Sequence, residues 1–411
     1  MIKTNTKCRD CRSGKLTKFL DLGSQPLANS FSRTEDLTAV ERTYPLEVYF
    51  CSDCGLTQLV HVVNKEELFK HYVYFSSVMP KVSAYWEAYA LDLTKNFLKD
   101  KSSFVVEIGS NDGVLLKFFQ DRGYHVLGID PAKNIAKLAN ERGINTMAAF
   151  FSQRLAETIA AEQGPANIIL ANNVFAHIND HYDFCAGIKK LLHPQGVLVI
   201  EAPYLIDMFE NLTYDTVYHE HLSFLAVRPL IKLFERFGLE IFDVKIMPSQ
   251  GQSLRLFIGH KGAKSVSENV FCLIQKELEF KLDDLNSYFL LASRIEKSKS
   301  KLVGLLQELK NQGKTIAAYG APAKGNTLLN YCKIGPEVLD YAVDDLPLKQ
   351  GKLTPGMRVP VRNRQYAEFH RPDYYLLLAW NYKKAILEKE ADFIHKGGKF
   401  IIPIGDEPSI I

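Results

Sequence analysis

The fold class of this chain is decided by Ser103-Phe-Val-Val-Glu-Ile-Gly-Ser-Asn-Asp-Gly-Val-Leu-Leu-Lys-Phe-Phe119. An apolar run leads into a glycine-rich turn and then into helical spacing, which is the β-turn-α opening of a doubly wound α/β fold. Such a turn implies a nucleoside cofactor. The dinucleotide fingerprint G-x-G-x-x-G would need glycine where Asn111 and Val114 stand, so NAD is not the expected cofactor.

Three further apolar strands follow this turn in the order of a doubly wound fold. His125-Val-Leu-Gly-Ile-Asp130 ends in a carboxylate suited to ribose hydroxyls, and Ala166-Asn-Ile-Ile-Leu-Ala-Asn172-Asn173 ends at the cleft where such folds bind ligands. Gly196-Val-Leu-Val-Ile-Glu201 follows a helical segment and a predicted turn over Leu192-His-Pro-Gln-Gly196. One glycine-rich turn alone could be a plain structural turn, but the acidic strand end and the later strands favour a nucleoside site.

The pattern E-x-G-x-x-x-G that remains resembles the first motif of class I S-adenosylmethionine methyltransferases. In that resemblance Gly109 and Gly113 let the backbone approach the cofactor, and Asp130 holds its ribose hydroxyls. The cofactor-binding residues that we expect are Glu107, Gly109, Asn111, Asp112, Gly113, Asp130, Asn172 and Asn173.

Four of the seven cysteines occur as two C-x2-C pairs, Cys8 with Cys11 and Cys51 with Cys54. Each pair can place two thiolates on one metal, and two pairs complete the tetrahedral sulfur site that zinc prefers. Four thiolates leave no position open for water or substrate, so the zinc should be structural. Buried or redox-active cysteines are the alternative interpretation.

The composition is that of a packed globular protein, with 46% hydrophobic and 24% charged residues. Fifty basic and forty-seven acidic residues give a net charge of +3 without a basic stripe, so nucleic acid is not an expected partner. No apolar stretch reaches the ~20 residues of a membrane span, and the N-terminus does not look like a secretion signal. We therefore expect a cytoplasmic protein without a membrane partner.

Tyr218-His-Glu-His221 is dense in groups that move protons, and it follows the predicted strand end Glu201-Ala-Pro-Tyr204. Histidine titrates close to neutral pH and can act as a base without a large pKa shift. The spacing is not H-E-x-x-H, so a helical zinc-protease site is excluded. Taken alone, the segment could also be a polar loop with satisfied histidines.

Over essentially its full length the chain resembles the zinc-containing C-methyltransferases of deoxysugar biosynthesis, which make branched sugars. The motifs that carry this resemblance are the two C-x2-C pairs, Tyr72-Val-Tyr-Phe-Ser-Ser77, Glu107-Ile-Gly-Ser-Asn-Asp-Gly113, Asn172-Asn-Val-Phe-Ala-His177, Tyr218-His-Glu-His221 and Gly320-Ala-Pro-Ala-Lys324-Gly325. The resemblance implies His221 as the base that removes a sugar C–H proton beside a ketone. It places Tyr72, His177, Tyr218 and Glu220 in the same pocket.

The implied substrate is a nucleotide-linked 4-keto-6-deoxysugar, methylated by S-adenosylmethionine at carbon, with C3 as the expected position. Ser253, Arg255 and Lys324 are the expected substrate-binding residues, although Lys324 could also be a solvated loop lysine. Many relatives carry His-Gly-Gly before Ser-x-Arg, whereas Gln250-Gly251-Gln252 stands here, which leaves the contact made there open.

At 411 residues the chain exceeds the ~250 to 300 residues at which single cores stop growing. We expect a zinc module over residues 1–66, a methyltransferase domain over 67–265 and a second Rossmann-like domain over 266–411. Helical patterning covers roughly Glu66 to Lys99 and Ser265 to Leu309, and the apolar run Thr315-Ile-Ala-Ala-Tyr-Gly320 opens the last α/β unit. A monomer is the working expectation for the oligomeric state.

Two other function classes fit parts of the sequence. A small-molecule O- or N-methyltransferase would use the cofactor turn but would not need the enolate-forming groups at Tyr218, Glu220 and His221. A non-catalytic zinc-module binding protein with a degenerate α/β fold would show no cofactor turnover.

Overall fold

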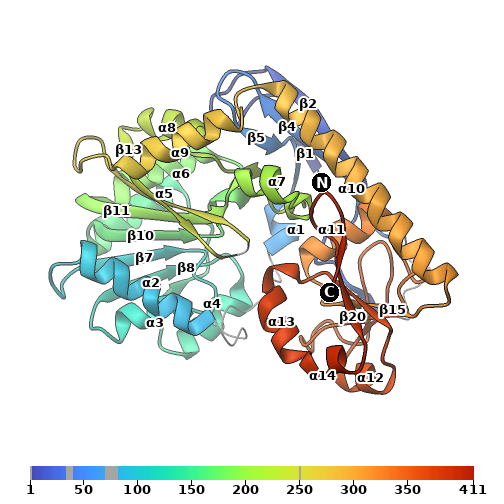
Figure 1. Cartoon of the computed structure of the whole chain (residues 1–411). Helices are drawn as coiled ribbons and strands as arrows, with labels where there is room; N and C mark the ends of the chain where they lie inside the picture. Colours follow the sequence, from blue (N-terminus) through green and yellow to red (C-terminus); the bar gives the residue numbers. More distant parts are fainter. Residues whose placement is uncertain (1, 34–39, 70–81, 250) are drawn as a thin grey trace.

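The central sheet has seven strands in the order β13-β14-β11-β10-β7-β8-β9 in a computed structural model that describes residues 2–33, 40–69, 82–249 and 251–411 (Figure 1). Strands β7 to β11 pair in parallel, and β14 and β13 complete the sheet antiparallel. Their bounds are β7 Phe104–Ile108, β8 His125–Ile129, β9 Thr146–Met147, β10 Ala166–Asn172, β11 Leu192–Pro203, β13 Leu239–Met247 and β14 Ser253–His260. The strand order reverses between β7 and β10, which is where open α/β sheets bind ligands.

Helices cover both faces of this sheet, which explains why its inner strands read as continuous apolar runs. Val105 of β7 packs with the buried residues of α2 and α3, whereas Val106 packs with those of α5, α6 and α8 on the other face. The helices of this region are α2 Val82–Phe97, α3 Val114–Gln120, α4 Lys133–Glu141, α5 Gln153–Gln163, α6 His181–Leu191, α7 Leu205–Asn211, α8 Val227–Glu235 and α9 Glu268–Glu279.

The N-terminal module is built on a four-stranded antiparallel sheet in the order β12-β5-β4-β2. Its strands are β2 Leu16–Gln25, β4 Tyr44–Cys51, β5 Thr57–Leu59 and β12 Ser223–Phe224. Strand β12 comes from the middle of the chain and directly follows the His221 segment. The short β1 Ile2–Thr4 pairs with β6 His61–Val63, and α1 Lys65–Phe69 follows. The module therefore shares a sheet with the segment expected to hold the base.

The C-terminal part forms a second sheet in the order β18-β16-β15-β19-β20-β21, parallel except for β21. The bounds are β15 Ile316–Tyr319, β16 Ala342–Val343, β18 Val361–Arg362, β19 Tyr374–Leu377, β20 Lys399–Ile402 and β21 Ser409–Ile410, with helices α11 Ala323–Cys332, α12 Arg364–Phe369, α13 Lys383–Lys389 and α14 Ala391–His395. Here the order reverses between β15 and β19.

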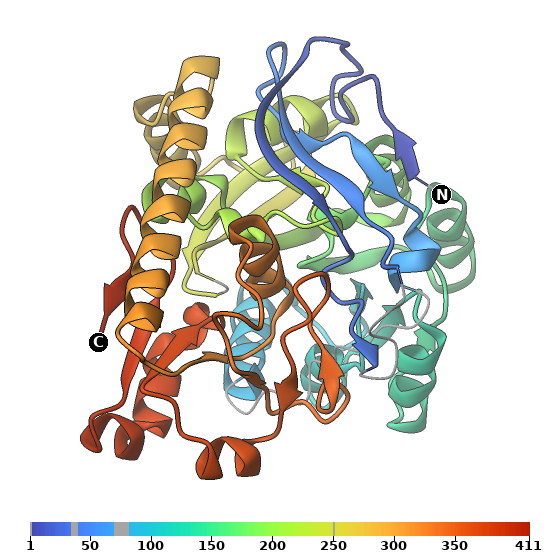
Figure 2. The ribbon, with the colours of Figure 1, turned by 90° about the vertical axis from the view of Figure 1, so that its right-hand side faces the viewer.

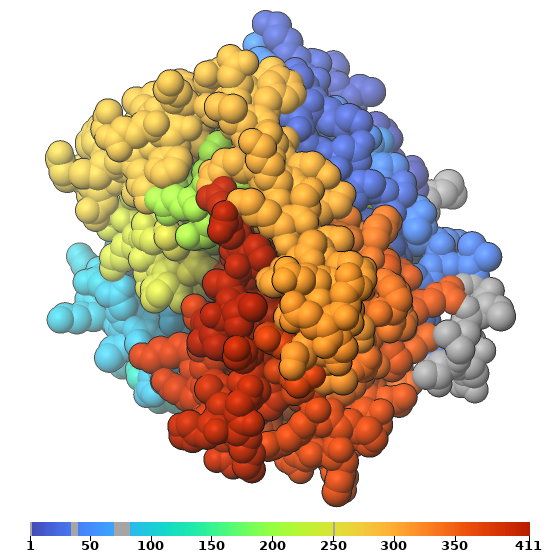
Figure 3. Space-filling model, turned by 45° about the vertical axis from the view of Figure 1, so that its right-hand side comes forward, coloured from blue at the N-terminus to red at the C-terminus, as the bar shows by residue number. Residues whose placement is uncertain are grey.

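The long helix α10, Leu285–Asn311, joins the parts of the molecule. It packs on β2 of the N-terminal module and on α11 of the C-terminal part, and Figure 2 shows it running along one side of the molecule. Figure 3 shows the orange and red surface from α10 onward packed beside the blue N-terminal module. Strand β3, Ser32–Arg33, also pairs with β17, Lys352–Leu353.

The two α/β units share one arrangement of hydrogen bonds around an aspartate. In the central sheet the Asp130 carboxylate accepts the backbone N–H groups of Asn111 and Ala132 at 3.0 and 2.9 Å. In the C-terminal sheet Asp344 accepts those of Ala321 and Leu346 at 2.8 and 2.9 Å. Each carboxylate thus ties the turn after the first strand to the end of the second strand, as the repeated order in the sequence predicts.

Most predicted elements are present, with two differences. The predicted turn over Leu192 to Gly196 is wrong, because Leu192 already pairs with Ala166 as part of β11 and the next pair is Ile168 with Val197. The extra residues therefore form a bulge within a strand. The predicted helical stretch from Glu66 to Lys99 contains α1 and α2 as separate helices, and residues 70–81 between them lie outside the described part.

The domain boundaries remain a prediction. Helix α9, assigned from sequence to the C-terminal part, packs on β13 and α8 of the central sheet. Among the described residues no helix combines the length and apolar character needed to span a membrane.

Candidate active site

The four cysteines of the two C-x2-C pairs converge in the N-terminal module. Their sulfur atoms all lie within 4.8 Å of one another, and the Cys8–Cys54 and Cys11–Cys51 Sγ separations are 3.6 and 3.5 Å. A tetrahedral site with zinc–sulfur bonds of ~2.3 Å has sulfur–sulfur edges of about 3.8 Å, so the geometry fits one zinc ion. Gln58 donates from Nε2 to the Cys8 sulfur at 3.1 Å and orients this ligand.

The two residues between Cys8 and Cys11 connect the zinc site to the central part of the chain. Arg9 is buried and donates to the carbonyl of Leu222 and, at 2.8 Å, to that of Leu59. Asp10 lies 2.5 Å from Nδ1 of His181 on α6, also fully buried. The zinc knuckle therefore contacts the residue next to His221 directly.

The His221 imidazole is held in one orientation by the backbone. Its Nδ1 lies 2.7 Å from the carbonyl oxygen of Thr216, and a carbonyl can only accept a hydrogen bond, so Nδ1 carries the proton. In the neutral ring Nε2 then has the free lone pair of a base. Burial lowers the pKa of His221 well below its ordinary value, and His177 and Lys324 add to this effect. The ring is neutral and ready to accept a proton at neutral pH.

Aromatic rings surround this base. The Tyr218 ring lies 4.0 Å from the His221 ring, and the His177 ring lies 5.0 Å away in an edge arrangement. Burial lowers the pKa of His177 to about 4, so it is neutral as well. The structure brings these three sequence-predicted residues together, whereas Tyr72 lies outside the described residues.

The two residues between Tyr218 and His221 point elsewhere. Glu220 is buried and accepts a hydrogen bond from Asn29 Nδ2 of the N-terminal module at 2.7 Å, and burial raises its pKa to about 7. His219 is also buried, with Nε2 3.1 Å from the carbonyl of Tyr44. Both side chains anchor the segment to the module.

Lys324 reaches this site from the C-terminal part, at the start of α11. It is buried, and burial lowers its pKa while Asp215 and Asp207 oppose that effect. The Trp380 ring lies 5.0 Å from its ammonium nitrogen, and the Trp380 indole N–H donates to Asp215 at 2.6 Å. Lys324 is therefore buried beside Trp380, and the solvated-loop alternative is wrong.

The glycine-rich turn after β7 has the backbone that its sequence requires. Gly109 and Gly113 have φ of +67° and +78°, which side chains of other residues disfavour. A Cβ on Gly109 would lie 2.3 Å from Val174 Cγ2, and one on Gly113 would lie 2.9 Å from Ile144 Cγ2. Both glycines are thus needed for packing within the protein as well as for the turn itself.

Buried polar atoms at this turn fit a nucleoside cofactor. Glu107 Oε2 and Ser110 Oγ are buried and have no hydrogen-bond partner within the described part of the chain. Burial raises the pKa of Glu107 well above its ordinary value, and the Asn172 side chain opposes that shift. The Asp130 carboxylate lies at the same edge, where its remaining acceptor capacity suits ribose hydroxyls. A polar ligand would satisfy these groups.

The other expected cofactor residues have partners within the protein. Asp112 is buried and paired with Arg142 at 2.8 Å, and the side-chain oxygen of Asn172 accepts from the Tyr89 hydroxyl at 2.9 Å. The Asn173 N–H donates to the Glu201 carbonyl at 2.6 Å, and Asn173 has a φ of +54°. These residues shape the edge between β10 and β11.

Ser253 and Arg255 are buried in the sheet, and their hydrogen bonds to the described residues go to side chains and carbonyls other than those of His221. The Ser253 hydroxyl donates to the carbonyl of Ser249, and Arg255 Nε binds Glu201 at 2.7 Å. Tyr85 completes this network by donating to Glu201 at 2.5 Å and accepting from Arg255 Nη2 at 2.9 Å. Their expected substrate contacts stay a prediction.

The segment Gln250-Gly251-Gln252 departs from the family pattern, and its Gly251 lies next to Asp207 and Trp380. Trp380 is the ring beside Lys324. Gly251 has a φ of +106°, and a Cβ there would lie 2.7 Å from Asp207 Oδ2 and 3.4 Å from Trp380 Cη2. The backbone at Gly251 therefore packs against these side chains. Gln250 lies outside the described residues.

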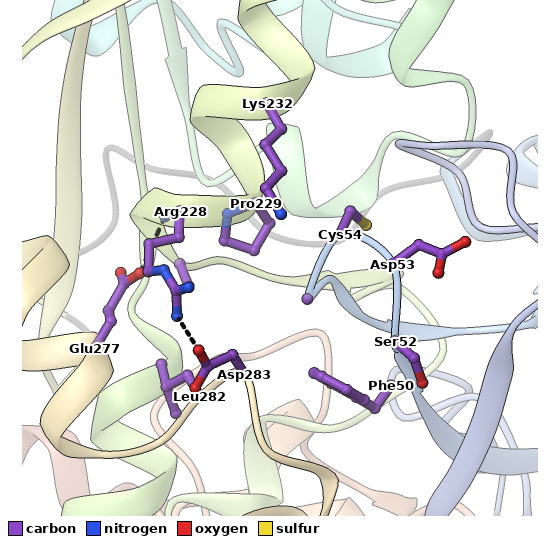
Figure 4. Close-up of a pocket in the computed structure, with 12 residues that line it drawn as sticks. Phe50, Ser52, Asp53, Cys54, Arg228, Pro229, Lys232, Glu277, Leu282 and Asp283 are labelled. Carbon is purple, nitrogen blue, oxygen red and sulfur yellow. Dashed lines mark hydrogen bonds and ion pairs between the residues drawn. The ribbon is translucent and has the colours of Figure 1, made fainter.

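A separate pocket opens behind the zinc site (Figure 4). Cys54 and Asp53 form one wall, and Arg228 and Lys232 of α8 form the other, with Arg228 paired to Asp283 at 3.1 Å. It contains none of the expected cofactor or substrate residues, so it is not the reaction site.

Family models match three parts of the chain. A putative zinc-binding domain matches residues 8–69, a methyltransferase domain matches 83–244, and a C-methyltransferase C-terminal domain matches 248–405. The C-methyltransferase NovU of Streptomyces niveus is 35% identical over 100% of this chain and 98% of its own length. This chain belongs to the C-methyltransferase family. It is an S-adenosylmethionine-dependent enzyme, and the predicted four-cysteine zinc site is confirmed.

Other similarities to this C-methyltransferase cover less of the chain. A ubiquinone biosynthesis O-methyltransferase of Aeromonas salmonicida is 26% identical over 34% of this chain and 64% of its own. The CcbJ methyltransferase of Streptomyces caelestis has a TM-score of 0.36 at 11% identity, covering 47% of this chain and 97% of its own.

Sequence reasoning about this C-methyltransferase missed the residues that support the site. Asp215, Thr216 and Trp380 belong to no recognisable sequence motif. They act as a buried acid, a backbone carbonyl and an indole after a strand end, and such groups have no characteristic spacing. The one available signal was that Asp215 and Thr216 directly precede the proton-transfer segment.

Proposed function

We propose that this C-methyltransferase transfers a methyl group to the carbon beside the ketone of a nucleoside-diphosphate-linked 4-keto-6-deoxysugar, with C3 as the carbon. The observation that carries this proposal is the neutral His221 ring, with Nδ1 bonded to Thr216 and Nε2 free to accept a proton. A carbon becomes a nucleophile beside a ketone once it loses its proton, and a positioned base is what this step requires.

His221 Nε2 takes the proton from that carbon, and the electron pair of the broken C–H bond moves through the carbonyl to the ketone oxygen. The resulting enolate carries a negative charge while His221 becomes positively charged. S-adenosylmethionine, when bound, would supply the electrophilic methyl group: the enolate carbon forms the C–C bond as the ketone is restored, the S–CH3 bond breaks, and its electron pair leaves with S-adenosylhomocysteine. Loss of the proton to solvent then returns His221 to its neutral form.

Lys324 has the charge to stabilise the enolate oxygen. Its pKa is lowered by burial, and its charge lowers the pKa of His221, which supports assigning both residues to one site. A buried cation facing a developing oxyanion acts in a water-poor environment where such interactions are strongest. Tyr218 and His177 line the same pocket and orient the sugar, with Tyr72 assigned to it by family resemblance.

Glu220 is assigned an indirect role, because its carboxyl accepts a hydrogen bond from Asn29 of the N-terminal module. It holds the base-bearing segment against the N-terminal module. Ser253 and Arg255 are also assigned an indirect role in substrate binding. Arg255 bonds to Glu201 and Tyr85, and Ser253 joins the same network through Ser249.

For the cofactor we propose the edge between β7 and β10. Gly109, Asn111 and Gly113 form the turn, Asp130 accepts the ribose hydroxyls, and Glu107 offers a buried carboxyl with an unused oxygen. Asp112, Asn172 and Asn173 shape this edge through their partners within the protein.

The proposal is tested by incubating the enzyme with S-adenosylmethionine and a panel of nucleoside-diphosphate-linked 4-keto-6-deoxysugars. Release of S-adenosylhomocysteine should match product formation, and carbon NMR should place the new methyl group on C3. The same sugars reduced at C4 serve as the control and should not react, because they lack the ketone. A methyl group on oxygen or nitrogen would contradict the proposal and favour an O- or N-methyltransferase.

A further inference from the structure

Asp215 is a buried carboxylate that the proposed reaction does not use. It lies in η4, the short helix Tyr214–Thr216, and its side chain is fully shielded from solvent. Oδ2 accepts the Trp380 indole N–H at 2.6 Å, and the Lys324 ammonium acts on its charge. Oδ1 is buried and has no hydrogen-bond partner among the described residues. Both of its partners come from the C-terminal part.

The residue after Asp215 fixes the orientation of the base. Thr216 gives its carbonyl to His221 Nδ1 at 2.7 Å, and its own N–H and hydroxyl donate to the Thr213 carbonyl at 3.1 and 2.8 Å. These bonds make η4 one tight turn. A shift of the Asp215 end therefore carries the Thr216 carbonyl with it.

We propose that Asp215 is a positioning residue for His221, and that the C-terminal domain acts on the base through it. The inference rests on the proposed role of His221. Trp380 holds the Asp215 carboxylate by its indole N–H, the tight turn transmits the position of Asp215 to the Thr216 carbonyl, and that carbonyl selects the His221 tautomer that has its proton on Nδ1.

The topology of the C-terminal sheet supports this role. Lys324 begins α11 after β15, and Trp380 follows β19, the strands between which that sheet reverses its order. Both side chains therefore lie at the edge where such a sheet usually binds a ligand. In this protein, Asp215 of the central domain contacts Trp380 at this edge of the C-terminal sheet.

The cost of burying the Asp215 charge makes its contact with the C-terminal part specific. A carboxylate removed from water is costly unless it is paired and hydrogen-bonded, and burial accordingly raises the pKa of Asp215 to about 6. The indole N–H supplies a hydrogen bond to this carboxylate, and the Lys324 charge favours its ionised form, only where the C-terminal domain meets η4. The base is thus in its reactive tautomer when the two α/β domains are in contact.

The experiment compares Trp380→Phe, Asp215→Asn and the double variant in the full-length zinc-containing enzyme. Trp380→Phe keeps an aromatic ring beside Lys324 but removes the N–H donor. Asp406→Asn is the matched control, because Asp406 is a carboxylate bonded to Arg294 of the same domain at 2.9 Å without contact to η4. Each protein is labelled with ¹⁵N-histidine, and the His221 signal is assigned with His221→Asn.

In wild type and the control, the ring ¹⁵N spectrum should show Nδ1 protonated and Nε2 bare. In Trp380→Phe and Asp215→Asn it should show a mixture of tautomers, with kcat lowered roughly 10- to 100-fold and KM for the sugar nucleotide within about twofold. The double variant should lose no more than the larger single loss, because both changes break one unit.

An unchanged His221 tautomer in Trp380→Phe would overturn the inference, whatever happens to kcat. Losses that multiply in the double variant would do the same. If Asp215→Asn fails to fold, the His221 tautomer in Trp380→Phe still tests the inference. The tautomer is read without substrate, so failure of the proposed methylation and failure of this inference are seen separately.

Discussion

At the scale of single residues, the proposed role of His221 as a base depends on surroundings that keep its ring neutral. Burial, His177 and the Lys324 charge all lower its pKa. A lowered pKa keeps the base form populated as pH falls. In the proposed mechanism the same Lys324 charge would favour the enolate oxygen, which is the kind of difference between ground state and transition state that catalysis needs.

Lys324→Met should therefore have two effects. The kcat should fall by about 10²-fold, as for loss of one oxyanion donor. The pKa of His221 should rise because a repelling charge is removed, so the acid limb of kcat/KM should move to higher pH. Activity profiles between pH 5 and 9 would show this.

Two controls make the pH result specific. Lys297→Met, an exposed lysine of α10, should leave the profile unchanged. Glu220→Gln tests whether the limb belongs to Glu220, whose pKa is about 7. An acid limb that stays in place or moves to lower pH in Lys324→Met would contradict the electrostatic account.

Asp130→Ala should weaken S-adenosylmethionine binding by about 1 to 3 kcal/mol, the range for hydrogen bonds to a charged group. The carboxylate loses its contact to the ribose and also releases the Asn111 N–H that it orders. Calorimetry measures the change. Asp344→Ala, which removes the equivalent acid of the C-terminal sheet, is the matched control and should leave the affinity unchanged. Wild-type affinity in Asp130→Ala would remove this residue from the site.

At the scale of elements, the zinc knuckle supports the active site as well as the module. Arg9 bonds to the carbonyl of Leu222, and β12 begins at the next residue and pairs with β5. A metal site that orders residues 8–11 therefore also orders the chain directly after His221. Structural zinc stabilises folds by closing such loops.

The purified enzyme should contain about one zinc per chain, and Cys51→Ser/Cys54→Ser should lose the metal, melt at lower temperature and lose methyl transfer. Elemental analysis and thermal unfolding measure this. Cys272→Ser is the matched control, since Cys272 is exposed on α9 and should not affect zinc. Zinc that persists in the double variant, or less than about half an equivalent in wild type, would contradict the assignment.

The sequence predicted those elements whose residues carry their own signal. The turn at Gly109 to Gly113 needs positive φ angles, and β7 is apolar on both faces, so both can be read from the chain. Strand β12 could not, because Ser223–Phe224 is too short for a periodic pattern and pairs with a strand far away in sequence. The sequence of the bulge in β11 looks like that of a turn, because proline and glycine are common both in bulges and in turns.

The same reasoning applies to the site. The cysteine pairs and Tyr218-His-Glu-His221 combine reactive side chains at short spacing, and they could be found. Asp215, Trp380 and Arg9 act through contacts between segments distant in sequence, which no local pattern reports.

At the scale of the whole molecule, residues of all three parts meet around the segment that carries the proposed base His221. The N-terminal module contacts its neighbours Leu222 and Glu220 through Arg9 and Asn29, and the C-terminal part supplies Trp380, which bonds to Asp215 and lies beside Lys324. Figure 1 shows the N-terminal module, the central sheet and the C-terminal sheet as three parts of one molecule. No single domain contains the complete proposed site.

The most direct measurement follows solvent deuterium into the sugar C–H beside the ketone. Wild-type enzyme with a cofactor analogue that cannot transfer its methyl group should exchange this hydrogen, as the proton on His221 passes to water. His221→Asn should lose both exchange and methyl transfer by at least ~10²-fold while binding S-adenosylmethionine normally. A His221→Asn enzyme that methylates within a few-fold of wild type would contradict the assignment of His221 as the base.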